Sequence, residues 1–182
     1  ERYRNWDKII LMASRLTYEK YIQTGIEAFS KISDKFPKTA LVIVGEGPEK
    51  EVLQKTAKTK GVSDRVFFEG WTNDLFGVYK VADIFLNTSI YEGYGLTLVE
   101  AGLSDCAVVS TRVGVAYDFS TDEACVTDVG NSDQIAECLK GILSNEQKRM
   151  SLSKNLNFRI KKESISLNEY LVKFKSVFYI TK

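Results

Sequence analysis

The chain has 182 residues, of which 44% are apolar and 27% are charged, and its formal net charge is +1. These values are ordinary for a globular protein, and the length suits one α/β domain better than two. The small net charge excludes a global field that draws the chain to nucleic acid or anionic lipid, so any bound anion must be held by local groups. The chain has no histidine, which excludes Ser-His-Asp and Cys-His catalysis and histidine-ligated zinc within it.

Three cysteines, Cys106, Cys125 and Cys138, contain no C-x-x-C pair. This usage predicts reduced, mostly buried thiols in a cytosolic domain. The chain begins with Glu1 and shows no signal peptide, so we expect it to be a piece of a longer protein. No apolar stretch approaches the length that spans a bilayer.

Short apolar runs alternate with segments of helical periodicity along the chain. The first expected pairs of strand and helix are KIILMAS with residues 19–34, ALVIVG with 48–60, RVFFEG with 74–81 and DIFLNTS with 95–103. AVVSTR with a short helical turn and ACVTDV with residues 132–143 complete the series. This alternation predicts an α/β fold of the Rossmann-like kind, with a parallel sheet covered by helices on both faces.

Local signals mark several helix ends. Pro48 suits a first helical position, and Gly61 suits the C-terminal cap of the same helix. Ser166 and Glu169 have capping-box spacing ahead of an apolar stripe, which predicts a helix near the end of the chain. That stripe packs either on the core of this domain or on a partner domain.

The loop after the first strand carries two cations, Arg15 and Lys20. In an open parallel sheet, ligands bind beyond the carboxyl ends of the strands, so both side chains could converge on one anion. A guanidinium grips two phosphate oxygens at once, and an ammonium adds a point charge. Lys20 in a first helical turn opposes the helix dipole, so a bound anion explains it better than helix stability does. The alternative is a pair of solvated surface cations.

The loop after the fourth strand reads YEGYGLTLVE. Gly93 and Gly95 can take backbone angles that are closed to other residues, and the helix amides beyond them favour a phosphate. Glu92 before the turn and Glu100 within the helix offer carboxylates to sugar or ribose hydroxyls. The alternative is that Glu92 complements the helix dipole and Glu100 is a solvated helix position.

The loop after the second strand, GEGPEK, resembles the start of the dinucleotide fingerprint G-x-G-x-x-G, with Glu69 ending the next strand. Lys50 stands where the third glycine belongs and Pro48 follows the second glycine. A turn that leads into a helix therefore explains this loop better than NAD binding does.

Taken in order, five segments resemble a known family: RLTYEK, LVIVGEGPEKEVL, VFFEGWTNDLFGVYKVADIFL, SIYEGYGLTLVEAG and VVSTRVG. They are similar to the C-terminal, donor-binding half of retaining glycosyltransferases of family four, which have the two-domain GT-B fold. The resemblance extends to about Leu143. It implies that residues 1–182 are a single nucleotide-sugar-binding domain, and that an N-terminal acceptor domain is absent from this chain. It further implies transfer of a hexose from a nucleotide diphosphate sugar to an acceptor hydroxyl with retention.

The resemblance also implies roles for matching positions. Arg15 and Lys20 would bind the donor diphosphate, and together with Glu92, beside the donor sugar, they form the expected catalytic set. Glu100 would bind the ribose hydroxyls. The other expected binding residues, which bring main-chain amides to the sugar and phosphate or border the base, are Gly70, Trp71, Thr72, Gly93, Tyr94, Gly95 and Leu96.

No cofactor and no metal are implied, because cations and helix amides would stabilise the leaving diphosphate. The expected partners are a UDP-, GDP- or ADP-sugar and an acceptor glycan or lipid held by the N-terminal half, and no nucleic acid. The expected location is the cytoplasm, either free or at the inner face of a membrane that the other half contacts. Alone, the chain is expected to bind the donor nucleotide weakly and to transfer little.

The chain departs from the family pattern at several positions. Tyr21 stands where the family often has glycine, and Ala124 stands at a usual glycine before the sixth strand. The family loop V-G-G-x-x-E reads VGVAYD here, with Val115 and Asp118 as replacements. A sugar-nucleotide epimerase, a non-catalytic nucleotide-sensing module and an NAD-binding domain stay open as alternatives. A phospho-receiver domain is disfavoured, because its acidic cluster would stand where Arg15 is.

Overall fold

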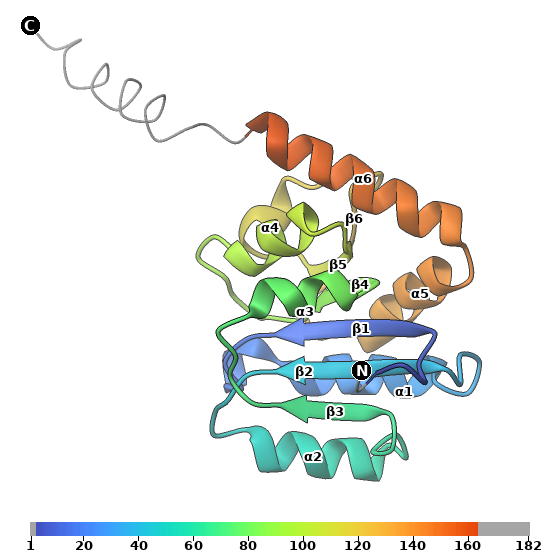
Figure 1. Cartoon of the computed structure of the whole chain (residues 1–182). Coiled ribbons are helices and arrows are strands. Elements are labelled where there is room, and N and C mark those ends of the chain that lie inside the picture. The colour runs from blue at the N-terminus through green and yellow to red at the C-terminus, as the bar shows by residue number, and fades with distance from the viewer. Residues whose placement is uncertain (1–2, 164–182) are drawn as a thin grey trace, which may run out of the picture.

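The computed structural model describes residues 3–163, and each of its strands is followed by a helical segment (Figure 1). The strands are β1 (Lys8–Ala13), β2 (Thr39–Val44), β3 (Val66–Glu69), β4 (Ile84–Asn87), β5 (Ala107–Thr111) and β6 (Ala124–Thr127). The α-helices are α1 (Ile22–Ile32), α2 (Lys50–Thr59), α3 (Leu75–Val81), α4 (Leu96–Leu103), α5 (Ser132–Leu143) and α6 (Glu146–Glu163). Two short 3₁₀ turns, η1 (Tyr18–Lys20) and η2 (Gly114–Tyr117), lie in the loops after β1 and β5.

The strands form one sheet in the order β3-β2-β1-β4-β5-β6, and every neighbouring pair is parallel. The arrowheads of β1, β2 and β3 point to the same side in Figure 1. The chain first builds outward from β1 to β3, and it then returns to the other side of β1 to place β4. The predicted Rossmann-like α/β fold with a parallel sheet is confirmed.

Helices cover both faces of the sheet, as predicted. Successive side chains of a strand point to opposite faces, so a strand that is covered on both sides is apolar throughout. In β1, Ile10 and Met12 join the core formed with α1, α2 and α5, whereas Ile9, Leu11 and Ala13 join the core formed with α3 and α4. Fully burying one such large apolar side chain stabilises the fold by about 1.5–3 kcal/mol.

Helix α6 was not among the expected elements, although its sequence carries a signal for it. Leu152, Leu156 and Ile160 recur every fourth residue, and all three are buried. The amide of Asn157, on the same helix, donates to the carbonyl of Gly102 at 3.1 Å and so ties α6 to the end of α4. The predicted helix with its cap near residue 166 lies outside the described residues.

The expected helix over residues 19–34 is divided by Tyr21. This residue has φ 49° and ψ 38°, in the left-handed region, so η1 ends there and α1 begins at the next residue. A left-handed residue with a side chain costs about 1–2 kcal/mol relative to glycine. The rings of Tyr21 and Tyr18 pack in an edge-to-face arrangement, with their centroids 6.0 Å apart. The left-handed backbone explains why glycine is common here in the family.

Only one end of α2 follows its sequence signal. Pro48 lies just before the N-cap residue Glu49 and two residues ahead of the first helical residue, Lys50, so its predicted place at the first helical position is wrong. Gly61 has φ +74°, as expected of a glycine that follows a helix.

The prediction of three reduced thiols is wrong for two of them. Cys125 and Cys138 form a disulfide, with their Cα atoms 6.0 Å apart, that joins β6 to α5. Packing of α5 against the edge strand brings the two residues together, which their spacing alone does not reveal. Cys106 is the buried free thiol that was expected, and burial raises its pKa to about 12. This thiol is therefore protonated and unreactive at neutral pH.

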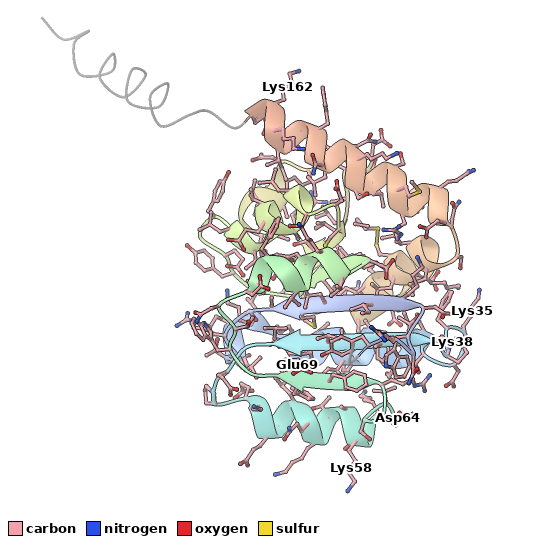
Figure 2. The ribbon with its side chains drawn as sticks, in the orientation of Figure 1. Lys35, Lys38, Lys58, Asp64, Glu69 and Lys162 are labelled. Atoms are coloured by element: carbon pink, nitrogen blue, oxygen red, sulfur yellow. A yellow bond between two sulfur atoms is a disulfide. The ribbon has the colours of Figure 1, made fainter. Side chains whose placement is uncertain are left out.

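The solvent-facing sides of the helices carry polar side chains. Figure 2 shows Lys58 on α2 and Lys162 on α6 pointing away from the body of the domain. Within residues 3–163, no helix combines the length and the apolar character needed to cross a membrane.

Candidate functional site at the carboxyl edge of the sheet

Two loops meet where the strand order reverses. β1 pairs directly with β4, so the loops that follow these strands are neighbours at the carboxyl edge. The helices beyond them then diverge, since α1 packs on one face of the sheet and α4 on the other. Such a divergence opens a crevice, and ligands of open parallel sheets bind there.

A cavity of about 390 Å³ lies at this crevice. Its lining comes from the end of β1, the loop after it, and the turn that starts α4: Ala13, Ser14, Arg15, Lys20, Glu92, Tyr94, Gly95, Leu96 and Thr97. A second cavity, of about 270 Å³, shares Arg15 and Thr97 with the first and extends to Trp71 and Thr72. The structure thus brings most of the predicted site residues to one groove. Gly70, Gly93 and Glu100 do not line these two cavities.

Lys20 and Glu92 form an ion pair in the wall of the first cavity. The Lys20 ammonium lies 2.7 Å from Glu92 Oε1, and each side chain is only 15% exposed. Two further bonds hold their loops together: the Thr88 hydroxyl donates to the Lys20 carbonyl at 3.0 Å, and the Ile90 amide donates to the Glu19 carbonyl at 2.9 Å. A pair removed from water in this way is a strong local interaction, and it presents one cation and one anion to the cavity.

Arg15 is held much more loosely than Lys20. Its side chain is 77% exposed, and its guanidinium lies 3.4 Å from Glu19 Oε1. The same carboxylate oxygen accepts a shorter bond, 2.7 Å, from the Thr17 hydroxyl, which lowers the pKa of Glu19. An exposed ion pair of this length contributes little, so Arg15 can turn toward an anion in the cavity at small cost.

Glycines permit the tight turn on the Glu92 side of the cavity. Gly95, the N-cap of α4, has φ +89°. Gly114, with φ +50°, lies so close to this turn that a Cβ there would be 2.4 Å from the Tyr94 carbonyl oxygen and 3.1 Å from the Glu92 Cβ. The next amide, of Val115, donates to that carbonyl at 2.7 Å. The loop after β5 is therefore bonded to the loop that carries Glu92, even though its sequence departs from the family pattern.

Gly93 does not need the freedom that its sequence position suggested. It has no positive φ, and a Cβ built on it meets nothing within 4 Å. The expectation that Gly93 takes a backbone angle closed to other residues is therefore wrong. Open space at Gly93 still leaves the main chain accessible to a ligand.

Glu100 lies one turn beyond Thr97 on α4, at the spacing that places two residues on the same helix face. The hydroxyl of Tyr79, which is 1% exposed, donates to Glu100 Oε2 at 3.1 Å. Burial, with the negative charge of Glu100 beside it, raises the pKa of Tyr79 well above its usual value. The tyrosine therefore stays a hydrogen-bond donor, and it holds Glu100 with the other carboxylate oxygen free to accept a bond.

The loop after β3 forms the far wall of the groove. Trp71 is 72% exposed, and with Thr72 it lines the smaller cavity. Gly70 lies beside Glu46, so that a Cβ there would be 3.1 Å from Glu46 Oε1. Asp74 caps α3 by accepting a bond from the Gly77 amide at 2.8 Å, and this cap fixes where the loop ends.

The glycines of the GEGPEK loop serve the packing of two loops. A Cβ on Gly45 would lie 1.9 Å from the Ser14 carbonyl oxygen, and one on Gly47 would lie 2.3 Å from the Leu16 carbonyl oxygen. The Leu16 amide donates to the Glu46 carbonyl at 2.8 Å across this contact. These glycines are thus explained by backbone contact with the loop after β1, without a dinucleotide.

Two groups of residues that adjoin the site were not predicted from the sequence. Ser89 and Asn87, both buried, connect Glu92 to the sheet interior. Their signal was a run of polar residues, NTS, at the end of a strand that should be buried. Gly114 and Thr97 also adjoin the site, and the family loop V-G-G pointed to the former.

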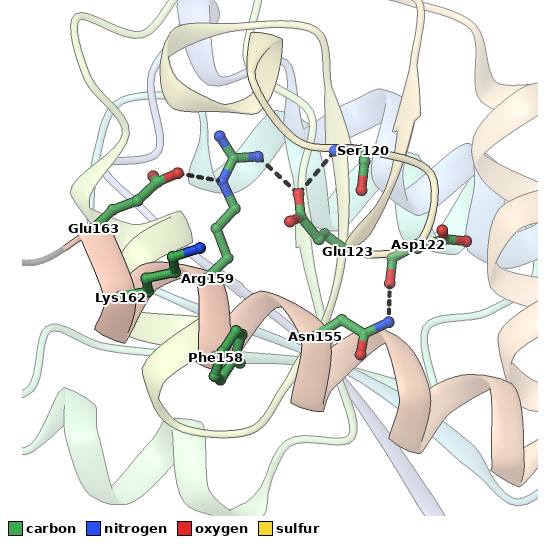
Figure 3. Close-up of a pocket in the computed structure, with 8 residues that line it drawn as sticks. All are labelled: Ser120, Asp122, Glu123, Asn155, Phe158, Arg159, Lys162 and Glu163. Carbon is green, nitrogen blue, oxygen red and sulfur yellow. Dashed lines mark hydrogen bonds and ion pairs between the residues drawn. The ribbon is translucent and has the colours of Figure 1, made fainter.

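A larger cavity, of about 540 Å³, lies elsewhere, between α6 and the turn before β6 (Figure 3). Arg159 bridges Glu123 at 2.7 Å and Glu163 at 3.1 Å, and the Asn155 amide donates to the Asp122 carbonyl at 2.9 Å. Arg159 and the two glutamates of this cavity thus satisfy one another, and none of the predicted site residues lines it. Across residues 3–163, no group of three or more acidic or cysteine side chains is placed to hold a metal ion.

Comparison with known proteins agrees with the family resemblance of the sequence. A family model described as Glycosyl transferases group 1 matches residues 3–157. The chain is 30% identical over 160 residues to the alpha-monoglucosyldiacylglycerol synthase of Acholeplasma laidlawii, covering 87% of this chain and 40% of that protein. The chain therefore spans less than half the length of this relative.

Solved structures share the fold. The C-terminal domain of a glycosyl transferase group 1 family protein from Francisella tularensis superposes with a TM-score of 0.82 at 26% identity, covering 87% of this chain and 86% of that domain. The Anabaena protein Alr3699/HepE, in complex with UDP, superposes with a TM-score of 0.88 at 22% identity, covering 97% of this chain and 50% of that one. The part of each structure that this chain matches has the same Rossmann-like fold, which is nearly all of the Francisella domain and half of the Anabaena protein.

Proposed function

Since this chain belongs to the glycosyl transferases group 1 family, we propose that it is the donor-binding half of a retaining glycosyltransferase. The enzyme would move a hexose from a nucleotide diphosphate sugar to an acceptor hydroxyl and keep the configuration at the anomeric carbon. The observation that carries this proposal is the convergence of Arg15, Lys20 and Glu92 on one cavity beside the start of α4. Two cations and one carboxylate match a diphosphate that is joined to a sugar.

The cations are proposed to stabilise the leaving group. As the bond from sugar to phosphate breaks, negative charge grows on the diphosphate, and groups that attract this charge lower the barrier more than they strengthen donor binding. Lys20 is nearly buried and Arg15 is free to turn. The first amides of α4 have no partner within the helix and favour an anion at its start. We propose that this positive charge makes a divalent metal unnecessary.

Lys20 is proposed to serve the donor and Glu92 together. An ammonium has three donors, and one of them is directed at Glu92 Oε1 at 2.7 Å. The other two remain for phosphate oxygens, so donor binding does not require the ion pair to break. The pair would then hold Glu92 against the sugar while the lysine holds the diphosphate.

Glu92 is proposed to position the sugar and to stabilise positive charge that develops at its anomeric carbon. The chain has no histidine, so the base for the acceptor hydroxyl would be the departing phosphate or a group outside this chain. Glu100 is proposed to accept bonds from the ribose, and Trp71 and Thr72 to border the base. The exposed aromatic ring of Trp71 offers a flat apolar surface for stacking.

Residues 1–182 are proposed to act as one nucleotide-sugar-binding domain beside an N-terminal domain that binds the acceptor. This division is supported by the 40% share of the Acholeplasma relative that the chain covers. An acceptor glycan or lipid would reach the groove from that domain. The proposed location is the cytoplasm, free or at the inner face of a membrane through that domain.

Nucleotide binding to the 182-residue chain tests the proposal most directly. UDP, GDP and ADP would be titrated into labelled protein and followed by NMR, which measures weak affinities; UDP comes first because a protein of the same fold is a UDP complex. Lys20→Ala should weaken binding of the preferred diphosphate by about 10- to 150-fold, which corresponds to about 1.5–3 kcal/mol for a lost charge-assisted bond.

Lys31→Ala is a matched control. Lys31 forms an ion pair of 2.6 Å with Asp133, away from the groove, so this variant makes the same change in net charge. It should leave nucleotide affinity unchanged. The loss in Lys20→Ala should also be larger at low salt than at high salt, because part of the attraction is screened. Equal affinities in the two variants would contradict the phosphate assignment, and a preference for NAD over all three diphosphates would overturn the proposed function.

A further inference from the structure

The strands that end below Glu92 carry an unusual set of buried polar side chains. At their carboxyl ends β1 and β2 are apolar, with Ala13 and Val44 as last residues. By contrast, β4 ends in Asn87, which is 8% exposed, and β5 ends in Ser110 and Thr111, both 0% exposed. Burying polar groups costs free energy unless each finds a partner, so a strand end made of them needs an explanation.

These polar groups form a continuous hydrogen-bonded network that ends on Glu92. Asn87 and Ser110 are directly opposite each other in the pairing of β4 with β5, and Asn87 Nδ2 lies 3.2 Å from Ser110 Oγ. Asn87 Oδ1 lies 2.8 Å from the hydroxyl oxygen of Ser89, which is 1% exposed. The same hydroxyl oxygen lies 2.7 Å from Glu92 Oε1. Glu92 is therefore held from the interior by Ser89 and from the cavity side by Lys20.

A second bond fixes Ser89 itself. The hydroxyl of Thr111 donates to the Ser89 carbonyl at 2.7 Å. Both the main chain and the side chain of Ser89 are thus anchored to buried groups of β4 and β5. A hydrogen-bond donor that is fixed in this way restricts the orientation of the carboxylate that it holds.

The Ser89 hydroxyl has a single proton and two acceptor oxygens within reach, on Asn87 and on Glu92. A bond to a carboxylate is the stronger of the two, so the proton goes to Glu92. A half-turn of the Asn87 amide then presents Nδ2 to Ser89 and Oδ1 to Ser110. The Ser110 hydroxyl, which otherwise donates to the Thr111 carbonyl at 2.8 Å, then turns its proton to Asn87 Oδ1. In that arrangement Ser110, Asn87 and Ser89 each donate toward Glu92.

We propose that Asn87 and Ser89 are positioning residues that hold the Glu92 carboxylate in place for the donor sugar. The inference rests on the proposed function, because it assigns the sugar to Glu92. It goes beyond that function in locating the control of sugar affinity in the interior of the sheet, behind the cavity. The diphosphate end of the donor depends on Arg15 and Lys20 and not on these two residues.

The test compares each nucleoside diphosphate with its sugar form. UDP and UDP-glucose, GDP and GDP-mannose, and ADP and ADP-glucose would be titrated by NMR into the wild-type chain and into Ser89→Ala. The variant should bind the diphosphate within about twofold of wild type and should lose about tenfold in the extra affinity that the sugar gives, as expected for one charge-assisted bond. In the complete protein that carries this chain, kcat should fall while the KM for the acceptor stays unchanged.

Two further variants make the result interpretable. Asn87→Asp keeps the shape of the side chain but places a carboxylate beside Ser89, which competes with Glu92 for the Ser89 proton, so it should reproduce the effect of Ser89→Ala. Thr127→Val removes an equally buried hydroxyl on β6, whose bond to the Ser110 carbonyl is 3.5 Å long, and it should leave both affinities unchanged. If Ser89→Ala fails to fold, Asn87→Asp decides the matter alone.

The outcomes separate the inference from the function. Wild-type chain that binds no diphosphate and no sugar nucleotide would overturn the proposed function. Wild-type chain that prefers sugar nucleotide, with the preference intact in Ser89→Ala and Asn87→Asp, would overturn the inference and leave the function standing. A loss of sugar preference in Thr127→Val as well would also overturn it, because the effect would then come from any buried hydroxyl.

Discussion

Replacing Gly114 with alanine should disturb the site through its backbone. The residue has φ +50°, where a side chain costs about 1–2 kcal/mol. The added methyl group would also lie 2.4 Å from the Tyr94 carbonyl oxygen, and these backbone atoms can separate only by lengthening the 2.7 Å bond from the Val115 amide to that carbonyl. Losing that bond adds about 0.5–1.5 kcal/mol, so Gly114→Ala should lower the free energy of unfolding by about 1.5–3.5 kcal/mol.

Gly61 offers a matched control for this change. It also has a positive φ, +74°, but a Cβ placed there meets no atom within 4 Å. Gly61→Ala should therefore show the conformational cost alone, about 1–2 kcal/mol. Gly61 lies after α2, away from the groove, so the Gly61→Ala variant should bind nucleotide as tightly as wild type.

Urea unfolding of the two variants measures the stability difference, and NMR titration with diphosphates and sugar nucleotides measures the effect on the site. Gly114→Ala should be the less stable variant and should weaken sugar-nucleotide binding, because the Glu92 loop has to move. Equal stability losses together with unchanged sugar-nucleotide binding in Gly114→Ala would refute the reasoning from close contact.

Three further predictions concern stability and use urea unfolding. Asp74→Ala removes the N-cap of α3 and should cost about 1 kcal/mol, whereas Asp74→Asn should cost much less; equal losses would argue against the cap. Reduction of the disulfide between Cys125 and Cys138, 13 residues apart in sequence, should cost about 3 kcal/mol, and an unchanged midpoint with reductant would contradict it. Arg149, with a neighbouring lysine, lowers the pKa of Glu146 from 4.5 to about 2, so stability from this group is present above pH 4.5 and is lost as the pH falls toward 2. Glu146→Gln should therefore flatten the acid limb of the stability profile, and an unchanged limb would contradict this.

The order of elements and the location of the site could be predicted because both depend on local patterns. Apolar runs followed by helical periods define the strands and helices, and a parallel sheet places all the strand-to-helix loops at one edge. Arg15, Lys20 and Glu92 lie in those loops, so their shared cavity follows from topology. Helix α6 has an apolar spacing of the same kind, so a helix over its residues could also be predicted from the sequence.

The remaining features depend on contacts between distant segments. The buried link from Ser110 to Ser89 exists because β4 and β5 pair in one particular register, which no local pattern specifies. The disulfide depends on how α5 packs against β6. The left-handed backbone at Tyr21 could not be predicted from the residue type, since tyrosine rarely takes that conformation.

The ion pair between Lys20 and Glu92 also has a consequence for how the chain folds. Lys20 and Glu92 are 72 residues apart, and their loops meet only once β4 has paired with β1 on the side opposite β2. Strands that pair between β1 and β3 are about 25–31 residues apart in sequence, whereas Ile10 of β1 pairs with Ile84 of β4 across 74 residues. Pairing across the longer loop forms more slowly. We expect the groove to be among the last features to appear during refolding. Binding of a nucleotide would then report completion of the sheet, and a chain stalled after β3 would have Lys20 in place with no carboxylate opposite it.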